Sequence, residues 1–211
     1  MTDRSALGGN DFLDWSNVAA PFTPLASTFS APSAGGLGVA VSVPSPTAPI
    51  SQPFVFQNGP AISANFGDGD FILFSGLNFA TQAGNPGPIT LNFAIPVFAA
   101  GAQLLPDFGG DFTGFIAAFD VDNALIGSFS ALGTVSTDRD NSAPFFGIQS
   151  STANIARLVF STDAANVGIG INQLSILAVP VPEPPMAPGL LVFCGIVLGG
   201  LATLRRNRPP E

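Results

Sequence analysis

Apolar and polar positions alternate along most of the chain before Val179, and Gly, Pro, Asn and Asp interrupt the alternation every few residues. A period of two is typical of half-buried β-strands, and the interrupting residues favour turns. No segment before Val179 shows a helical period. The strands that this pattern predicts are Leu37–Val43, Phe54–Gln57, Ile62–Phe66, Phe71–Leu77, Ile89–Ile95, Ala102–Leu105, Thr113–Asp120, Ala124–Ser130, Phe145–Gln149, Ile155–Ser161 and Val167–Leu177.

The clearest unit is a hairpin. The strands Thr113–Asp120 and Ala124–Ser130 flank Val121-Asp122-Asn123, and Asp and Asn suit a tight turn. About ten short strands predict an all-β domain over residues 1–178, an antiparallel β-sandwich of jelly-roll type. Many of the 20 Phe residues would fill the space between its two sheets. Gly101 is interpreted as a loop or bulge glycine.

Charge narrows the range of functions. Residues 1–178 hold twelve Asp, no Glu and three Arg, a net charge of −9. Nucleic-acid binding requires clustered cations, so a nucleic-acid partner is excluded. The chain has no His, and Cys194 is its only Cys, so Ser-His and Cys-His catalysis and most zinc sites are excluded. We expect a protein that is not an enzyme.

Two pairs of Asp remain as candidate metal ligands. Asp68 and Asp70 flank one glycine, and Asp138 and Asp140 flank Arg139. Carboxylates two residues apart in an extended loop could share a hard cation such as calcium, although neither pair matches an EF-hand loop. Asp also favours turns for backbone reasons. We therefore expect plain turns and no cofactor, and a calcium site at Asp68, Asp70, Asp138 and Asp140 is the alternative.

Trp15, the only Trp, is the candidate sugar-binding residue. Its ring could stack on a sugar, or it could belong to the core of a Phe-rich sandwich. Both interpretations stay open from the residue type alone.

The end of the chain has a different pattern. Residues 179–188 form a Pro-rich linker, residues 189–204 carry no charge, and residues 205–211 begin with Arg205 and Arg206, followed by Arg208. The uncharged run, extended slightly upstream, approaches the roughly 30 Å of a bilayer core at 1.5 Å per residue. It predicts one C-terminal transmembrane helix with its basic end in the cytoplasm, and a buried core helix is the alternative.

This tail resembles the PEP-CTERM sorting signal of Gram-negative bacteria. The motif of that family maps to Val181, Pro182, Glu183 and Pro184, followed by the apolar helix and the basic end at Arg205, Arg206 and Arg208. The resemblance implies that an exosortase, a membrane transpeptidase-like enzyme, recognises the motif and removes the tail. Residues 3–177 are in turn similar to a domain of secreted PEP-CTERM proteins that resembles carbohydrate-binding jelly rolls.

The resemblance implies an exported, non-enzymatic protein of the envelope or of a biofilm exopolysaccharide matrix, in transit through the inner membrane. The alternative is a carbohydrate-binding module, with or without help from calcium. The expected partners of the exported protein are an exosortase, the membrane and a surface glycan. Residues 1–18 lack the apolar core of a signal peptide and include Asp3 and Arg4. Because export needs such a signal, we expect the start of this sequence to be placed too late.

Overall fold

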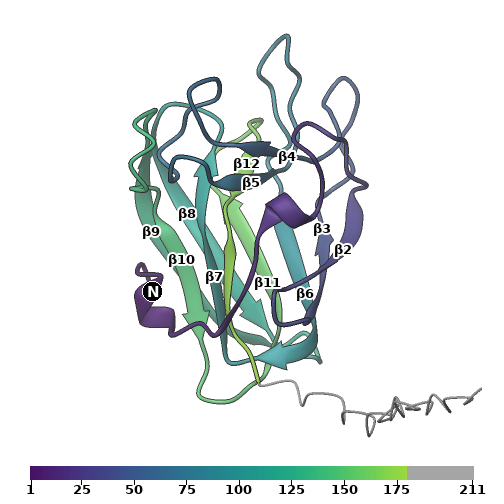
Figure 1. Cartoon of the computed structure of the whole chain (residues 1–211), viewed down its shortest axis with the longest axis vertical. Helices are drawn as coiled ribbons and strands as arrows, with labels where there is room; N and C mark the ends of the chain where they lie inside the picture. The colour runs from purple at the N-terminus through teal and green to yellow at the C-terminus, as the bar shows by residue number, and fades with distance from the viewer. Residues whose placement is uncertain (180–211) are drawn as a thin grey trace, which may run out of the picture. The chain divides into compact units, whose positions relative to one another are not determined.

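The computed structural model describes residues 1–179, and these residues form an all-β fold of two antiparallel sheets (Figure 1). Two short elements are 3₁₀ helices, η1 (Ser5–Leu7) and η2 (Trp15–Asn17). The strands are β1 (Asp11–Leu13), β2 (Thr28–Pro32), β3 (Gly38–Ser42), β4 (Phe54–Gln57), β5 (Phe71–Phe74), β6 (Ile89–Val97), β7 (Ala99–Pro106), β8 (Gly110–Phe119), β9 (Leu125–Val135), β10 (Phe145–Gln149), β11 (Ile155–Thr162), β12 (Ile169–Ile171) and β13 (Leu174–Leu177).

One sheet has seven strands in the order β1-β13-β7-β12-β5-β4, with β10 paired to the other edge of β7. The other has six strands in the order β2-β3-β6-β11-β8-β9. Every pair of neighbouring strands is antiparallel. The predicted all-β sandwich of antiparallel sheets is therefore confirmed at this level.

Strand alternation places the main core between the two sheets. In β7, Ala100, Ala102 and Leu104 belong to this core, whereas Gln103 and Leu105 point to the opposite face. All eight residues of β7 are nonetheless buried. Something must therefore cover the second face of the seven-stranded sheet, which we call the outer face.

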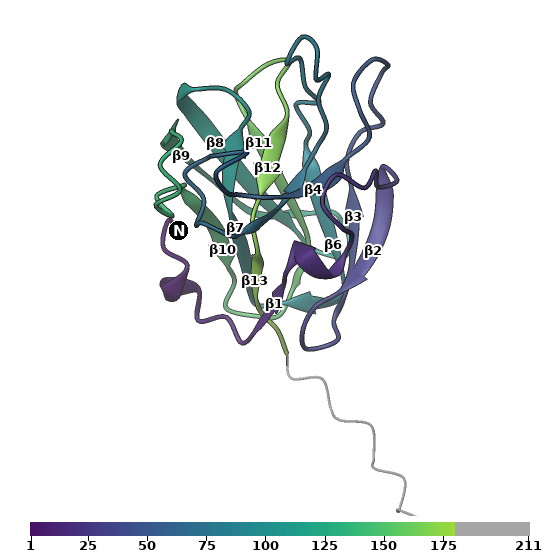
Figure 2. The same cartoon turned by 45° about the horizontal axis from the view of Figure 1, so that its top comes forward.

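The outer face is covered in part by the N-terminal segment. Figure 1 shows this segment in purple as it crosses in front of β7, and Figure 2 shows β1 beside β13. Leu7 is fully buried and packs with Ala99 and Phe145 in a small cluster of its own. Near the opposite end of the face, Phe56, Phe74 and their neighbours form a third apolar cluster. The strip between these two apolar clusters is polar.

The hairpin of β8 and β9 has the predicted position, and its turn shows why. Asp120 accepts hydrogen bonds through Oδ1 from the backbone N–H groups of Asp122 and Ala124, at 2.9 and 2.8 Å. Asn123 adopts a φ of +63°, a left-handed conformation that Asn tolerates better than most residues. The turn therefore depends on Asp and Asn, the residue types from which it was predicted.

The segment Ile62–Phe66, predicted as a strand, is a loop instead. The side chain of Asn58 accepts a hydrogen bond from the N–H of Ala64 and donates to the carbonyls of Ala64 and Phe66. This amide satisfies backbone groups that a neighbouring strand would otherwise bind. Local side-chain bonding therefore replaced sheet pairing.

Two further predictions needed correction. Gly101 lies inside β7, between Gly147 of β10 and Ser175 of β13, and is not a loop glycine. A Cβ there would meet the Gly147 Cα at 2.7 Å, which explains the glycine. The predicted strand Val167–Leu177 is two strands, β12 and β13, separated at Asn172 and Gln173. The strands β1 and β2 were not predicted.

Among residues 1–179, no helix is long and apolar enough to be a membrane span. The predicted transmembrane helix at 189–204 lies outside the described residues, as do the sorting motif and the basic end.

Candidate functional site

The two predicted Asp loops, although some 70 residues apart in the chain, lie side by side. Gly67 and Asp140 form a β-bridge between them. The residue that joins them is a cation: Nη1 of Arg139 donates to Oδ1 of Asp68 at 2.7 Å. Asp68 is largely exposed and Arg139 partly so, and solvent screening keeps the contribution of this pair to stability at about 1 kcal/mol or less.

The other three acids bind backbone or side-chain groups nearby. Asp70 accepts from the N–H of Gly67, Asp138 from the hydroxyl of Ser136, and Asp140 from the N–H of Ser142. The hydrogen bonds from Ser142 lower the pKa of Asp140 below its usual value. Within residues 1–179, no group of three or more His, Cys, Asp or Glu is placed to hold a metal. Apart from a hydrogen bond that Asp70 accepts from Asn172, the contacts of Asp68, Asp70, Asp138 and Asp140 are those of turn and loop residues.

Trp15 is part of the core. Its side chain is fully buried, and Nε1 donates to the backbone carbonyl of Asn172 at 2.8 Å. A buried indole presents no face to a sugar, so the stacking interpretation is wrong for this residue. The carbonyl of Asn172 explains how a Trp can be buried there, because the buried N–H of its indole needs an acceptor.

A polar network occupies the middle of the outer face, and Asn172 is at its centre. The side-chain amide of Asn172 donates to Oδ2 of Asp70 at 2.9 Å and to Oε1 of Gln103. Its Oδ1 accepts from Nη2 of Arg4 at 2.8 Å and from the backbone N–H of Gln103 at 3.0 Å. All the hydrogen-bonding capacity of this buried amide is used.

Gln103 extends the network across the sheet. Its Nε2 donates to the backbone and side-chain oxygens of Asn141, and to the carbonyl of Ala143 at 2.8 Å. The network thus links β7 to the loop that precedes β10 and to the break between β12 and β13. Such a network holds its side chains in fixed positions, as a rigid binding surface requires.

Arg4 brings a positive charge to the network. Its Nη1 donates to the carbonyl of Gln173 at 2.9 Å and to Oγ of Ser175 at 2.6 Å, and the guanidinium lies 5.1 Å from the centre of the Phe145 ring. Burial lowers the pKa of Arg4, and the negative charge of Asp70 partly offsets that effect. The guanidinium of Arg4 nevertheless remains charged, because arginine is not deprotonated in proteins.

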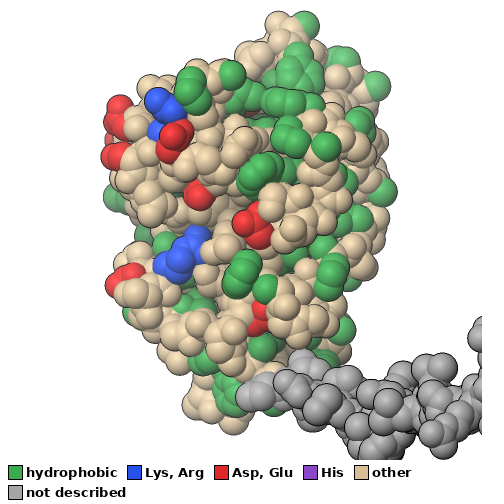
Figure 3. Space-filling model, in the orientation of Figure 1, with side chains coloured by type: hydrophobic (Ala, Val, Ile, Leu, Met, Phe, Trp, Pro, Cys, Tyr) green, Lys and Arg blue, Asp and Glu red, His purple; other side chains and the backbone are tan. Residues whose placement is uncertain are grey.

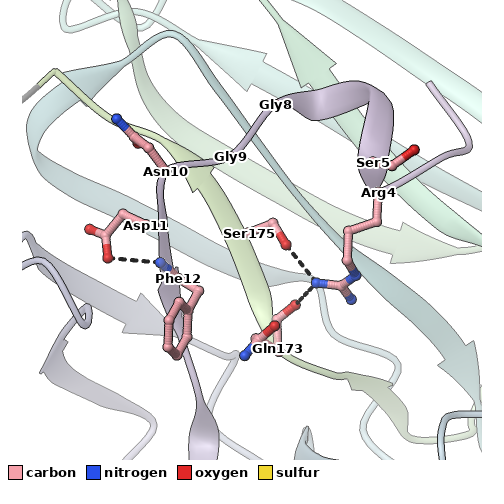
Figure 4. A pocket seen from close by; sticks show the side chains of 9 residues that line it. All are labelled: Arg4, Ser5, Gly8, Gly9, Asn10, Asp11, Phe12, Gln173 and Ser175. Carbon is pink, nitrogen blue, oxygen red and sulfur yellow. Dashed lines mark hydrogen bonds between the residues drawn. The ribbon is translucent and has the colours of Figure 1, made fainter.

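Arg4 lines three neighbouring hollows on this face. The largest, about 410 Å³, is lined by Arg4 and eight other residues, all shown in Figure 4. A second, of about 220 Å³, includes Asp14, Asp70 and Asn172, and a third, of about 350 Å³, includes Gln103 and Asn141. In Figure 3, blue side chains lie on this face near the middle, with red side chains around them. We call the three hollows together the Arg4 groove.

Phe12 gives the largest hollow an aromatic wall. Phe12 is 43% exposed, although β1 pairs with β13. Figure 4 shows Arg4 reaching toward Gln173 and Ser175, with the Phe12 ring on the other side of Gln173. The hollow therefore combines a guanidinium, an amide, hydroxyls and an apolar ring. Such groups bind a ligand that carries many hydroxyls and an apolar ring face.

The pattern of hydrophobic and polar positions did not predict this groove. Arg4 precedes the first predicted strand, and Phe12 lies in β1, which was not predicted. One signal was available: Arg4 is one of only three cations in residues 1–178, and a rare residue type is informative. The Asn172-Gln173 pair, two polar residues inside a long apolar run, was a second.

Comparisons with known proteins identify no family. No family model matches the chain, and no curated protein does either. Among solved structures, the protein is similar to one chain of a crystal structure of accessory secretory proteins 1, 2 and 3 of Streptococcus pneumoniae, with 11% identity and a TM-score of 0.26 over 85% of this protein and 99% of that chain. It is also similar to a DUF4465 family protein of Bacteroides caccae, with 12% identity and a TM-score of 0.37 over 80% of this chain and 93% of that one. At these TM-scores, neither likeness bears on the function.

Proposed function

We propose that the protein is an exported, non-enzymatic component of the cell envelope or of an exopolysaccharide matrix, sorted through its C-terminal tail by an exosortase. The observation that carries the proposal is the position of the motif relative to the fold. The last strand, β13, ends at Leu177, and the Val181–Pro184 motif begins just beyond it. A compact unit extends over Met1–Val181.

This position supports processing. Cleavage within Pro182–Pro184 would leave every strand of the described residues in the released product. A strand or core residue placed beyond the motif would have made the same cleavage destructive. The finer features belong to the proposal as well: a jelly-roll arrangement of the sandwich, a transmembrane helix at 189–204 and a cytoplasmic basic end at Arg205, Arg206 and Arg208.

The test is the intact mass of the protein from its native host, in strains with and without the exosortase. We expect a mature form that ends within Pro182–Pro184 only when the enzyme is present. Glu183→Ala should block this processing, and Glu211→Ala, which removes the other acid of the tail, should leave it unchanged. A full-length chain in both strains would overturn the proposal.

A second candidate function, carbohydrate binding, is favoured by the Arg4 groove. The groove places polar side chains of a rigid hydrogen-bond network beside an exposed aromatic ring. Binding of the full-length protein to an array of neutral and acidic glycans tests this function. If no glycan on the array is bound, carbohydrate binding is contradicted. A calcium-assisted module would lose its signal with a chelator. We expect no such loss, because Arg139 already pairs with Asp68.

A further inference from the structure

We infer that the Arg4 groove binds a saccharide that bears a carboxylate, such as a uronic acid, with Arg4 as the partner of the carboxylate and Phe12 as the support for the sugar ring. This inference rests on the carbohydrate-binding function proposed above and names its ligand class. The juxtaposition that carries it is a partly buried cation beside an exposed aromatic ring, in a domain that is otherwise strongly acidic.

Arg4 is a cation with unused binding capacity. Its three hydrogen bonds all go to neutral acceptors, the carbonyl of Gln173, Oγ of Ser175 and Oδ1 of Asn172. A guanidinium has five N–H groups, so two remain without an acceptor among residues 1–179. The one ion pair within this part of the chain joins Arg139 to Asp68. Because a partly desolvated charge gains from an opposite charge, Arg4 favours an anion.

The charges around the groove restrict where the anion can lie. Asp11 is the one acid that lines the largest hollow, and its carboxylate accepts hydrogen bonds from Oγ of Ser33 and from the N–H of Gly35 at 2.7 Å. Figure 4 shows this carboxylate pointing away from Arg4. Asp14 and Asp70, in contrast, line the second hollow. We therefore place the carboxylate of the ligand in the largest hollow.

The remaining groups of this hollow suit the rest of a sugar. The side-chain amide of Gln173 makes no hydrogen bond with the described residues, so both its donor and its acceptor are available. The Ser175 hydroxyl accepts a hydrogen bond from Arg4 and keeps its own hydrogen to donate. The Phe12 ring offers an apolar surface for the C–H groups of a pyranose.

The acidic domain sets a limit on ligand charge. A long polyanion would be repelled by the net charge of −9, at distances up to the Debye length of about 10 Å in 0.1 M salt. A short oligosaccharide is repelled less and can still reach Arg4. We expect its affinity to hold or rise as salt screens the domain, rather than fall as it does for a cationic binding surface.

The experiment is calorimetric titration of the full-length protein, in detergent, with trigalacturonate and with its methyl ester. The two ligands share their rings and hydroxyls and differ in charge. We expect binding of the free acid that is about tenfold or more tighter than binding of the ester. Equal binding would overturn the carboxylate assignment and leave carbohydrate binding standing, whereas no binding of either ligand or of the neutral glycans would contradict both.

Variants locate the site. Phe12→Ala removes an exposed ring, so it should fold normally and weaken binding of both ligands. Arg4→Gln should abolish the preference for the acid, and Arg4→Lys should retain part of it. Arg157→Gln removes the same charge from the six-stranded sheet, where the guanidinium lies over Phe119, and should change nothing. Unaltered binding in Phe12→Ala and in a folded Arg4→Gln would overturn the inference.

Discussion

At the scale of single residues, the outer face depends on Asn172. This buried amide binds Arg4, Asp70 and Gln103 at once, and its backbone carbonyl accepts the hydrogen bond of the Trp15 indole. The side chain is hard to replace, since its three partners Arg4, Asp70 and Gln103 would each lose a hydrogen bond in a place where water does not readily substitute. The groove and the core therefore share one residue.

We expect Asn172→Ala to lower the free energy of unfolding by about 3 kcal/mol, because it leaves buried polar groups of Gln103 without partners. Urea denaturation monitored by Trp15 fluorescence measures the change. The adjacent Gln173→Ala is the matched control, since that side chain makes no hydrogen bond with the described residues. A similar cost for both variants would show that the network does not stabilise the fold.

Asp163 makes stability depend on pH. Its Oδ1 accepts a hydrogen bond from the N–H of Thr113 at 2.9 Å, and this bond lowers the pKa of Asp163 below the usual 3.8. A carboxyl with a lower pKa in the folded state stabilises above pH 3.8, and its contribution is lost as the pH falls through the folded pKa.

We therefore expect Asp163→Asn to be less stable than wild type at neutral pH and the difference to shrink below pH 3.8. Urea midpoints measured from pH 7 to pH 2 test this. Asp122→Asn is the control, because the carboxylate of Asp122 accepts no hydrogen bond within residues 1–179. A gap between the Asp163 variant and wild type that stays constant with pH would contradict the assignment.

At the scale of elements, β9 is an edge strand with little to prevent association. It forms one edge of the six-stranded sheet, is 11 residues long and contains neither a charge nor a Pro. Natural edge strands usually carry such residues to prevent pairing with another chain. Leu132, in the C-terminal half of β9, is 81% exposed.

We expect Leu132→Lys to reduce concentration-dependent association of the protein and to change the free energy of unfolding by no more than about 0.5 kcal/mol. Sedimentation velocity over a range of concentrations measures association. Val121→Lys adds the same charge in the β8–β9 turn, at a side chain that is 69% exposed, and should have little effect. If the two variants behave alike, net charge rather than the β9 edge controls association.

At the scale of the whole molecule, the described fold is complete before the sorting motif. The main core draws on both sheets, from Leu13 of β1 to Ile176 of β13. Because β13 pairs with both β1 and β7, the end of the domain is tied to its beginning and to its centre. The tail beyond Val181 is therefore separable from the fold in sequence.

We expect a chain that ends at Val181 to melt within about 2 °C of the full-length protein in the same detergent, because the removed residues contribute no strand of the described fold. Differential scanning calorimetry measures this. A chain that ends at Gln173 is the contrast: it lacks β13, and we expect it not to fold. A large loss of stability on removal of the tail alone would contradict the separation.

Local chemistry determined much of this architecture. The period-two pattern from Ile89 to Phe119 predicts strands that the structure contains, since burial of alternate side chains requires only a strand with one face on a core. Asp120 and Asn123 specify the β8–β9 turn, because their hydrogen bonding and left-handed conformation are properties of those residues and their neighbours. The resemblance of the tail likewise depends on the order of residues alone.

Only the tertiary structure decided what depends on distant partners. Gly101 belongs to a strand because β10 and β13 approach it from two sides, and Trp15 is core because the carbonyl of Asn172, far along the chain, is there to accept its N–H. The Arg4 groove is of the same kind: its cation and ring come from the first residues, whereas the amides of Gln103, Asn172 and Gln173 come from β7 and from the break between β12 and β13. Periodicity records which side of an element is buried, and it does not record which elements meet.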